Sequence, residues 1–395
     1  MVFGGGSLAC GLVPPDLSSV RAELPCLADE VYLNSGGAGP LPASVAAAIG
    51  GAIAGNLARG RLGIATALEA DEREIRLRAE LGALLGAGPE DVALTGNTTV
   101  GLDVVIWGID WRPGDEMITT ALEHPGLSVP LRIAARRAGA TLHLIPADES
   151  HGDLEAAVAR RAGPRTRLVA LSHVAWGTGA RLDVAGAARA ARAAGALTAV
   201  DGAQSVGAIP VDPAALGVDA YAFPAHKWLL GPEGLGGLWV APEARERIDL
   251  SFAGYDSGTD HRPDGALTLH AGARRYETST PPAPLLPGWS AALGWLETLG
   301  WDWIFGRVRA GQAAARERLE RVPGVRILTP PGEQAGLVTF TLDGVDPEAA
   351  CRTLYARGVT VRWLTEPAAL RASIGFFTDA ADVERLAAEV ASLGG

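Results

Sequence analysis

The sequence has very little lysine: Lys227 is the single lysine among 395 residues, and arginine supplies every other strong base. Arginine keeps its charge under all ordinary conditions, whereas a desolvated lysine amine can lose its proton and act as a nucleophile. Lys227 stands in the apolar stretch 224–230, which is unsuited to a solvated cation. We therefore predict that Lys227 is a covalent catalyst; the alternative is an incidental surface lysine.

Cysteines, basic runs and long apolar runs are also scarce. Cys10, Cys26 and Cys351 are too widely spaced for a disulfide framework or a zinc site. The net charge of −11 argues against a nucleic-acid partner, because binding a polyanion needs a basic patch. No apolar run is long enough for a membrane span, and no basic segment of a signal peptide is present. We expect a cytoplasmic protein that binds a small molecule, with no metal, nucleic-acid or membrane partner.

Periodicity predicts two domains after an N-terminal arm. From residue 91 to residue 247 short apolar strands alternate with helices, which is typical of an α/β domain with a mostly parallel sheet covered on both faces. From about residue 325 the pattern changes to strand, helix, strand, strand and helix, with one strand expected over residues 373–377. We expect an arm that packs with the small domain, a large α/β domain and a small α+β domain, over residues 1–28, 29–285 and 286–395.

Polar side chains follow two neighbouring strands of the predicted sheet. Asp201 follows the strand 197–200, Gln204 comes three residues later, and Lys227 follows the next strand, 220–223. Ligands of parallel α/β sheets collect at the carboxyl ends of the strands, so we expect these groups to lie together. They match what pyridoxal 5'-phosphate (PLP) needs, namely a lysine that binds it covalently and an acid that keeps its pyridine nitrogen protonated. Alternatively, Asp201 is a helix N-cap that starts a turn.

Three further segments have the composition of ligand loops. Residues 95–99 (TGNTT) follow a strand and open a helix, where amides and hydroxyls form a ready anion site, although Thr and Asn are also usual caps. His124, in the turn EHPG, could stack on a cofactor or cap a helix. Residues 34–40 (NSGGAGP) either allow a ligand to approach the backbone closely or form a plain turn.

Together these motifs resemble the class V aminotransferase family of PLP enzymes, which includes the cysteine desulfurases. The resemblance extends from residue 33 to residue 393 and includes DGAQ, AHKW, TGNTT and EHPG. Within the family it is nearest to the cystine C-S lyases, through LNSGGAG, LSHVAWGTG, VDGAQSVG and GPEGLGG. It implies the PLP-dependent transferase fold of type I, with a large domain around a mostly parallel sheet and a small C-terminal α+β domain. It also implies a homodimer with shared active sites.

The resemblance implies a role for each residue of the site. Lys227 would bind PLP covalently, Asp201 would pair with the pyridine nitrogen, and Gln204 would bond the phenolic oxygen. His124 would stack on the ring, beside Trp176, which forms an apolar wall or merely fills the core. The phosphate would be held by Asn97, Thr98 and His226, and by Thr280 of the partner subunit. The substrate would be bound by Arg371, Arg362, Gly37 and Ala38.

Departures from the family narrow the expected activity. Desulfurases attack sulfur with a cysteine thiolate on a loop upstream of the arginine matched by Arg371, but residues 358–367 contain no cysteine. Cys351 falls in a predicted helix, where a free cysteine behaves as a small hydrophobe. Pro224 stands where desulfurases have a hydroxyl, so one phosphate contact is missing. We expect a C-S lyase that β-eliminates a cysteine S-conjugate or cystine to pyruvate, ammonia and a thiol or persulfide.

Two other functions fit the same residues. One is different PLP chemistry in specialised metabolism, namely transamination, decarboxylating deamination to an aldehyde, or epimerisation. The outcome depends on which bond at Cα stands perpendicular to the ring, and local sequence does not determine that angle. The other is a catalytically inactive PLP-fold binding protein. Pro224 and Trp176 favour it, whereas the intact Lys227, Asp201 and His124 argue against it.

Overall fold

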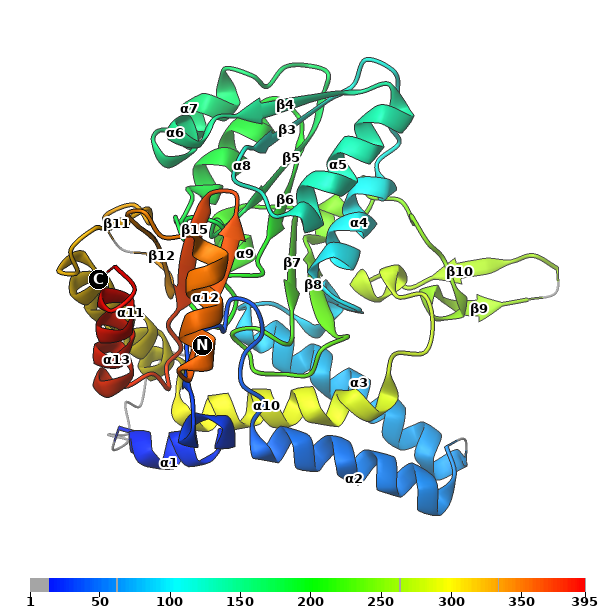
Figure 1. Ribbon diagram of the computed structural model, residues 1–395. Coiled ribbons are helices and arrows are strands. Elements are labelled where there is room, and N and C mark those ends of the chain that lie inside the picture. Colours follow the sequence, from blue (N-terminus) through cyan, green and yellow to red (C-terminus); the bar gives the residue numbers. More distant parts are fainter. Residues whose placement is uncertain (1–13, 62, 263, 333, 395) are drawn as a thin grey trace, which may run out of the picture.

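The computed structural model describes residues 14–394, with positions 62, 263 and 333 left out. In this part of the chain a seven-stranded sheet has the order β2-β8-β7-β6-β5-β3-β4 (Figure 1). Its strands are β2 (Val92–Thr95), β3 (Glu116–Thr120), β4 (Thr141–Ile145), β5 (Thr166–Ser172), β6 (Leu197–Asp201), β7 (Ala220–Pro224) and β8 (Gly236–Val240). β8 runs antiparallel to both of its neighbours, and the other neighbouring pairs are parallel. The predicted mostly parallel sheet is confirmed.

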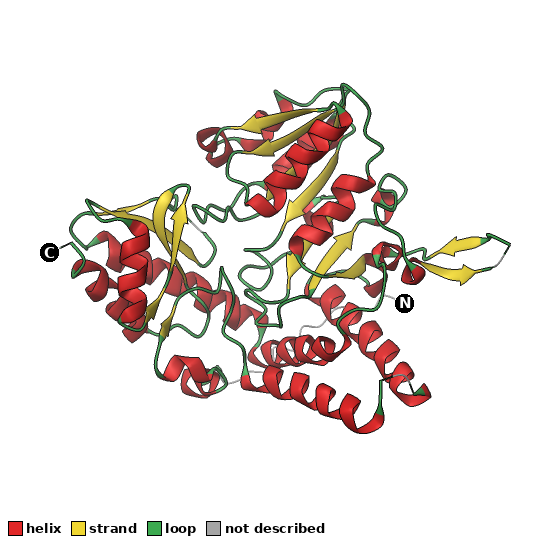
Figure 2. Cartoon of the chain, turned by 45° about the vertical axis from the view of Figure 1, so that its right-hand side comes forward, coloured by secondary structure: helices red, strands yellow, loops and turns green. Residues whose placement is uncertain are grey.

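Helices cover both faces of this sheet (Figure 2). α4 (Thr98–Gly108) packs against α5 (Pro125–Ala138), and α7 (Leu154–Ala159) packs against α8 (Val184–Ala193). The connections through α5 and α8 step in opposite directions along the sheet, so right-handed crossovers place these two helices on opposite faces. Because both faces are covered, every residue of β2, β6 and β7 is buried.

A smaller antiparallel sheet near the C-terminus has the order β11-β12-β15-β14. Its strands are β11 (Val325–Ile327), β12 (Leu337–Leu342), β14 (Arg362–Thr365) and β15 (Ala368–Ser373). The helices beside it are α11 (Trp301–Glu320), α12 (Pro347–Ala356) and α13 (Ala380–Ala391). These elements share a hydrophobic core separate from that of the large sheet. The predicted small α+β unit is therefore present.

The strand predicted over residues 373–377 is wrong in its position. The observed strand β15 ends where the predicted one begins, and it pairs with β14 through the turn Glu366-Pro367. Phe376 and Phe377 made the later segment apolar, and both are buried. Their rings pack on each other with centroids 5.4 Å apart, so aromatic packing and not strand pairing explains the apolar run.

The N-terminal residues that the structure describes contact the C-terminal elements. In α1 (Leu17–Ala22), the Arg21 guanidinium bonds the carboxylate of Asp382 at 2.6 Å and the carbonyl oxygen of Phe377 at 3.0 Å. Likewise β1 (Val31–Tyr32) pairs in parallel with β13 (Val359–Thr360). The first part of the predicted arm, residues 1–13, lies outside the described residues.

Three long helices lie side by side below the large sheet (Figure 1). They are α2 (Ala43–Arg59), α3 (Ile64–Leu84) and α10 (Leu286–Leu299), and α10 packs against the other two. The segment that opens the predicted small domain thus contacts helices of the predicted large one. The boundaries at residues 28 and 285 stay predictions.

The remaining elements are short. β9 (Gly258–His261) and β10 (Leu267–Leu269) form a hairpin that projects from the body (Figures 1 and 2). The other short helices are α6 (Ala147–His151) and α9 (Pro213–Leu216), with 3-10 turns at Pro25–Ala28, Pro89–Asp91, Pro242–Ala244, Tyr255–Ser257, Ala273–Tyr276 and Ala283–Leu285. None of the helices in the described ranges has the length and apolar character needed to cross a membrane.

Candidate active site

A cavity of about 260 Å³ brings most of the predicted site residues together. Its wall contains Gly37, Asn97, Thr98, His124, Trp176, Asp201, Gln204, His226, Lys227, Arg362 and Arg371. Gly36, Thr99, Ala203 and Pro224 complete the lining. The residues come from the loop between β1 and α2, from the carboxyl ends of β2, β3, β5, β6 and β7, and from the β14–β15 hairpin. Strand ends of the large sheet therefore form the site together with the small sheet.

Lys227 lies three residues beyond β7 in a densely packed segment. Burial lowers the pKa of its amine to about 8. The negative charge of Asp201 raises this pKa, and the positive charges of Arg371 and Arg362 lower it further. Gly39 presses against this segment, since its amide donates to the carbonyl oxygen of His226 at 2.7 Å. A Cβ atom at Gly39 would lie 2.2 Å from the carbonyl oxygen of Lys227, so only glycine fits there. The loop of residues 34–40, which contains Gly39, therefore holds the backbone of Lys227 in place.

Asp201 ends β6 in the interior, and its Oδ1 accepts a hydrogen bond from the amide of Ala203 at 2.8 Å. Burial raises the pKa of the Asp201 carboxyl, while the positive charge of Lys227 lowers it. The turn predicted as an alternative is therefore present, and the same side chain also lines the cavity. No helix of the described chain begins directly after Asp201, so the helix N-cap alternative is wrong, and the carboxylate instead bonds a turn at the edge of the cavity.

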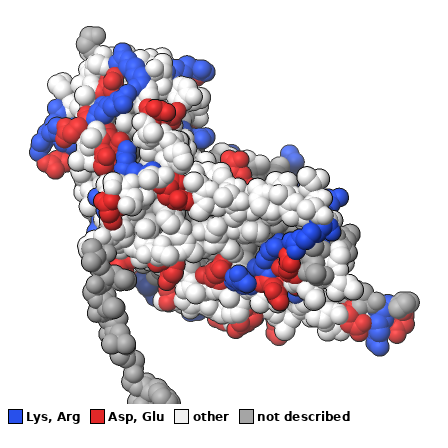
Figure 3. Space-filling view, turned by 90° about the horizontal axis from the view of Figure 1, so that it is seen from below, with Lys and Arg blue, Asp and Glu red and all other residues white. Residues whose placement is uncertain are grey.

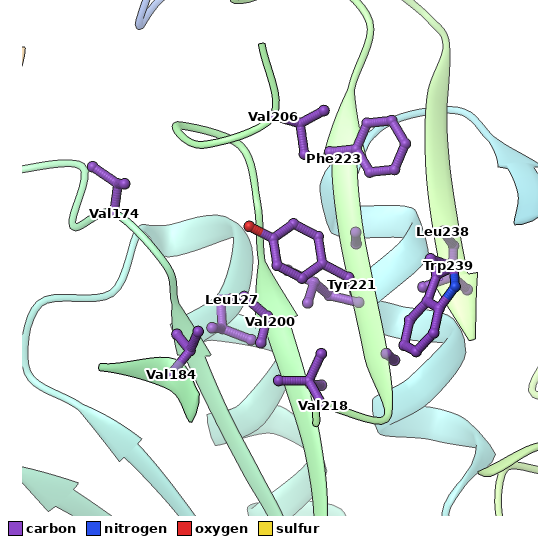
Figure 4. Close-up of a cluster of buried hydrophobic side chains, with 14 of the residues drawn as sticks. Leu127, Val174, Val184, Val200, Val206, Val218, Tyr221, Phe223, Leu238 and Trp239 are labelled. Carbon is purple, nitrogen blue, oxygen red and sulfur yellow. The ribbon is translucent and has the colours of Figure 1, made fainter. Parts of the chain in front are cut away.

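A buried hydrogen-bond chain holds the turn after Asp201. Ser205 Oγ donates to the carbonyl oxygen of Gly202 at 3.0 Å and lies 2.5 Å from the hydroxyl of Tyr221. Tyr221 therefore donates to Ser205 and accepts from Nδ1 of His173, 2.7 Å away. Tyr221 sits among apolar side chains of the sheet core (Figure 4), where an unpaired hydroxyl would be costly. The core thus fixes the turn that carries Asp201 and Gln204.

His124 is the N-cap of α5 and lines the cavity at the same time. Its Nδ1 accepts a hydrogen bond from the amide of Gly126 at 2.9 Å, so the ring proton is on Nε2. Burial, with nearby Lys227 and two arginines, lowers the pKa of His124 to about 4. The ring meets Trp176 edge to face, with centroids 5.0 Å apart. His124 is a neutral, oriented ring at neutral pH.

The N-terminus of α4 supplies hydrogen-bond donors to the cavity. Asn97 caps this helix by accepting from the amide of Val100 at 3.0 Å, and Thr98 and Thr99 begin it. The predicted cap and the predicted anion site are again compatible. Thr99 was part of the predicted anion segment 95–99 but was given no role of its own. Thr99 lines the same cavity as Pro224, which brings no side-chain donor to it.

Two arginines face the cavity from the small sheet. Arg362 and Arg371 are directly opposite each other in the β14–β15 pair, which places both side chains on one face. Arg371 is 1% exposed, and its Nη1 donates to the carbonyl oxygen of Trp176 at 2.7 Å. Burial, together with the charge of Arg362, lowers the pKa of Arg371 to about 9. Two neighbouring cations in a small cavity favour an anionic ligand.

Two predicted residues do not line the cavity. The carbonyl oxygen of Ala38 accepts from the hydroxyl of Tyr32 at 2.8 Å, and Ala38 is absent from the wall. Thr280 is exposed and bonds the hydroxyl of Tyr255 at 2.7 Å, so it does not reach the site of its own chain. No group of three metal-ligating side chains occurs in the part of the chain that the structure describes.

No cysteine lines the cavity in the described part of the chain. Cys351 is buried in α12, where its thiol donates to the carbonyl oxygen of Val361 at 3.4 Å and burial raises its pKa. Cys26 is exposed on the N-terminal segment.

The β14–β15 turn lies against Gly177, where a Cβ atom would be 3.3 Å from Pro367. A short hairpin closes this side of the site.

Solved structures of one protein, C-DES, resemble this chain over nearly its full length. A lysine-to-alanine mutant of C-DES, with glycine covalently linked to its PLP cofactor, is 33% identical, has a TM-score of 0.91, and is matched over 96% of this chain and 100% of that one. The complex of the cystine C-S lyase C-DES with its reaction product cysteine persulfide is 33% identical, with a TM-score of 0.90 and coverage of 94% and 100%.

Sequence comparison agrees with the structures. A probable cysteine desulfurase of Pseudomonas aeruginosa is 35% identical over 324 residues, which is 78% of this chain and 79% of the relative. The family model described as Aminotransferase class-V matches residues 31–386, which include every residue that lines the cavity. The chain therefore belongs to the class V aminotransferase family.

Proposed function

We propose that this protein is a PLP-dependent C-S lyase that eliminates the sulfur substituent of cystine or a cysteine S-conjugate. The observation that carries the proposal is a cavity that holds a buried lysine and two arginines and has no cysteine among the described residues of its wall. The similarity to C-DES, a cystine C-S lyase, supports the same reaction class. PLP is the cofactor of this enzyme, as it is in the C-DES structure.

The residues of the cavity fit PLP. His226 has a buried Nδ1 without a hydrogen-bond partner among the described residues, as expected of a donor that awaits a phosphate oxygen. Asp201 is a buried carboxylate with one oxygen tied to Ala203, which leaves the other for a pyridine nitrogen. Lys227 would hold the aldehyde carbon covalently, and Asn97, Thr98 and Thr99 would bind the phosphate at the start of α4. Gln204 would bond the phenolic oxygen, and His124 would stack on the ring.

Side chains of the cavity supply the proton acceptor and the carboxylate-binding groups that an elimination needs besides the cofactor. When bound, PLP withdraws electrons from the substrate Cα. Lys227 Nζ, whose pKa is about 8, takes the proton from Cα. Arg371 and Arg362 hold the substrate carboxylate and so orient the Cα–H bond. The electron pair of the broken Cβ–S bond leaves with the sulfur, and the three-carbon remainder takes up water to give pyruvate and ammonia.

The cysteine positions favour elimination over desulfuration. A desulfurase needs a thiolate within reach of the substrate sulfur, whereas Cys351 lies on the buried face of α12 and burial raises its thiol pKa. The segment 358–367, which lacks cysteine, folds into the tight β14–β15 hairpin and leaves no long loop to carry a thiol inward. These positions support the proposal that sulfur leaves as a small molecule.

The products distinguish elimination from its rivals. We expect the purified enzyme with cystine to form pyruvate and ammonia in equal amounts, with a persulfide in solution, and S-substituted cysteines to give pyruvate and the thiol. A variant with Cys10, Cys26 and Cys351 all replaced by alanine should keep kcat within about twofold, because no thiol takes part. Alanine as the product, with activity lost in the variant, would instead establish desulfuration. An oxo acid that retains its sulfur would establish transamination.

We also propose that the enzyme is a homodimer in the cytoplasm. Large apolar side chains are exposed along α2 and α3, namely Ile53, Leu57, Ile64, Leu68 and Ile75, and the view from below shows a broad uncharged band (Figure 3). Phe252 and Tyr255 are also exposed, and Tyr255 bonds Thr280. Two copies that meet through Phe252 and Tyr255 would place Thr280 of each at the interface, as its proposed role in the partner's site requires. The free thiols of Cys26 and Cys351 suit a reducing compartment.

Sedimentation tests the dimer. The protein should have twice the chain mass of 40.6 kDa, and Phe252→Glu should shift it towards the monomer, because a charge would be buried in the interface. Tyr355→Glu is the matched control, since Tyr355 and Phe252 are both 65% exposed and Tyr355 lies on α12. A monomeric wild-type enzyme with full activity would contradict the proposal.

A further inference from the structure

Trp228, the residue after Lys227, is buried and links separate parts of the site. Its indole Nε1 donates to Oε1 of Gln204 at 2.9 Å, and Nε2 of Gln204 donates to the carbonyl oxygen of Gly36 at 2.8 Å. The indole also packs tightly on the small sheet, since a Cβ atom at Gly336 would lie 2.4 Å from its ring. Trp228 and Gln204 are each 3% exposed. Packing therefore holds the indole nitrogen in place.

The two partners of Gln204 determine which way its amide faces. An indole nitrogen only donates, and a carbonyl oxygen only accepts. Trp228 must therefore bond the amide oxygen, and Gly36 must bond the –NH₂ group. In the reversed orientation two buried hydrogen bonds would be replaced by two repulsive contacts. One N–H of Gln204 remains, and Gln204 lines the cavity.

We propose that Trp228 is a positioning residue, which locks Gln204 so that the amide presents an N–H donor, and not its carbonyl, to the cofactor. This inference rests on the proposed function, in which Gln204 faces the phenolic oxygen of PLP. A donor stabilises the charged form of that oxygen, whereas an amide carbonyl would repel it. Without the indole N–H only the carbonyl oxygen of Gly36 still opposes the reversed orientation, so the amide is held less firmly. The pH at which the visible band of the loaded enzyme changes would then rise.

Trp228→Phe tests the inference because it removes the N–H and keeps an aromatic ring. We expect the pKa read from the visible absorbance of the PLP-loaded protein to rise by about one pH unit and PLP to bind about tenfold more weakly, the effect of one lost hydrogen bond. Trp239→Phe is the matched control. Trp239 is also buried, at 2% exposure, but its indole nitrogen has no hydrogen-bond partner among the described residues. That variant should leave the pKa and PLP affinity unchanged.

A double-mutant cycle shows whether Trp228 acts through Gln204. Gln204→Met removes the donor and should raise the same pKa, and adding Trp228→Phe to it should produce no further shift. A Trp228→Phe shift of equal size in the Gln204→Met background would overturn the inference, as would an unchanged pKa in Trp228→Phe. If Trp228→Phe does not fold, an unchanged pKa in Gln204→Met alone overturns it. Wild-type protein that forms no visible band with PLP would contradict the proposed function instead.

Discussion

Lys227→Ala is expected to abolish the visible absorbance of the PLP-loaded protein and to lower kcat by about 10³-fold or more. The reason is that one side chain both binds PLP covalently and accepts the α-proton, and no second lysine exists in the chain. Steady-state assays with cystine and absorbance spectra of the loaded protein measure the two losses separately. Full activity in this variant would refute the central assignment.

Lys227→Arg is the informative companion. It keeps a positive charge but cannot lose its proton at ordinary pH, so it should be as inactive as the alanine variant. Lys227→Ala should not reduce the free energy of unfolding through charge, because burial disfavours the charged amine and lowers its pKa to about 8, whereas the arginine keeps a buried charge. Retained activity in the arginine variant would show that charge, and not proton transfer, is the contribution of this residue.

Arg371→Leu is expected to raise KM by about 10²-fold or more with a smaller change in kcat, because a buried ion pair with the substrate carboxylate is lost. The same change should not lower the free energy of unfolding of the substrate-free protein. Arg371 is fully buried beside another cation, Arg362, and its Nε has no partner among the described residues. Removing such a charge relieves a desolvation cost.

Two measurements keep this prediction specific. Arg352→Leu, on α12, removes an exposed arginine that bonds Glu348 at 2.7 Å, and it should leave KM unchanged. Urea unfolding of both variants separates binding from folding. If Arg371→Leu destabilised the protein strongly while KM stayed constant, Arg371 would be a structural residue and not a substrate ligand.

The local pattern of apolar residues was sufficient to predict the strands of the large sheet. Its strands are short apolar runs bounded by Gly, Pro and polar residues, and the predicted strands at 197–200 and 220–223 match β6 and β7 to within about a residue. The pattern was less informative near the small sheet, where the apolar residues Phe376 and Phe377 led to the prediction of a strand that is not there. A buried aromatic pair in a loop and a buried strand have the same composition, and only neighbours in space distinguish them.

Several site residues had two local interpretations, and the structure shows the helix cap together with a place in the cavity wall, while their binding roles stay proposals. Asn97 and His124 are helix caps and also line the cavity, because the amide ends of helices and the ligand edge of the sheet coincide in an α/β fold. Thr280 differs, because it contributes nothing to the cavity of its own chain. Its proposed role depends on a second subunit.

The sequence by itself determined the strands of the large sheet and identified Lys227, Asp201, Gln204 and His124 as candidate site residues. It could do so because reactive residue types that directly follow a strand can be recognised from the local sequence. Tertiary structure alone decided how those residues are oriented. Arg362 faces the cavity with Arg371 through strand register, and Gln204 presents an N–H because Trp228 and Gly36 bond its other atoms. Such contacts join residues far apart in the chain, and no local pattern encodes them.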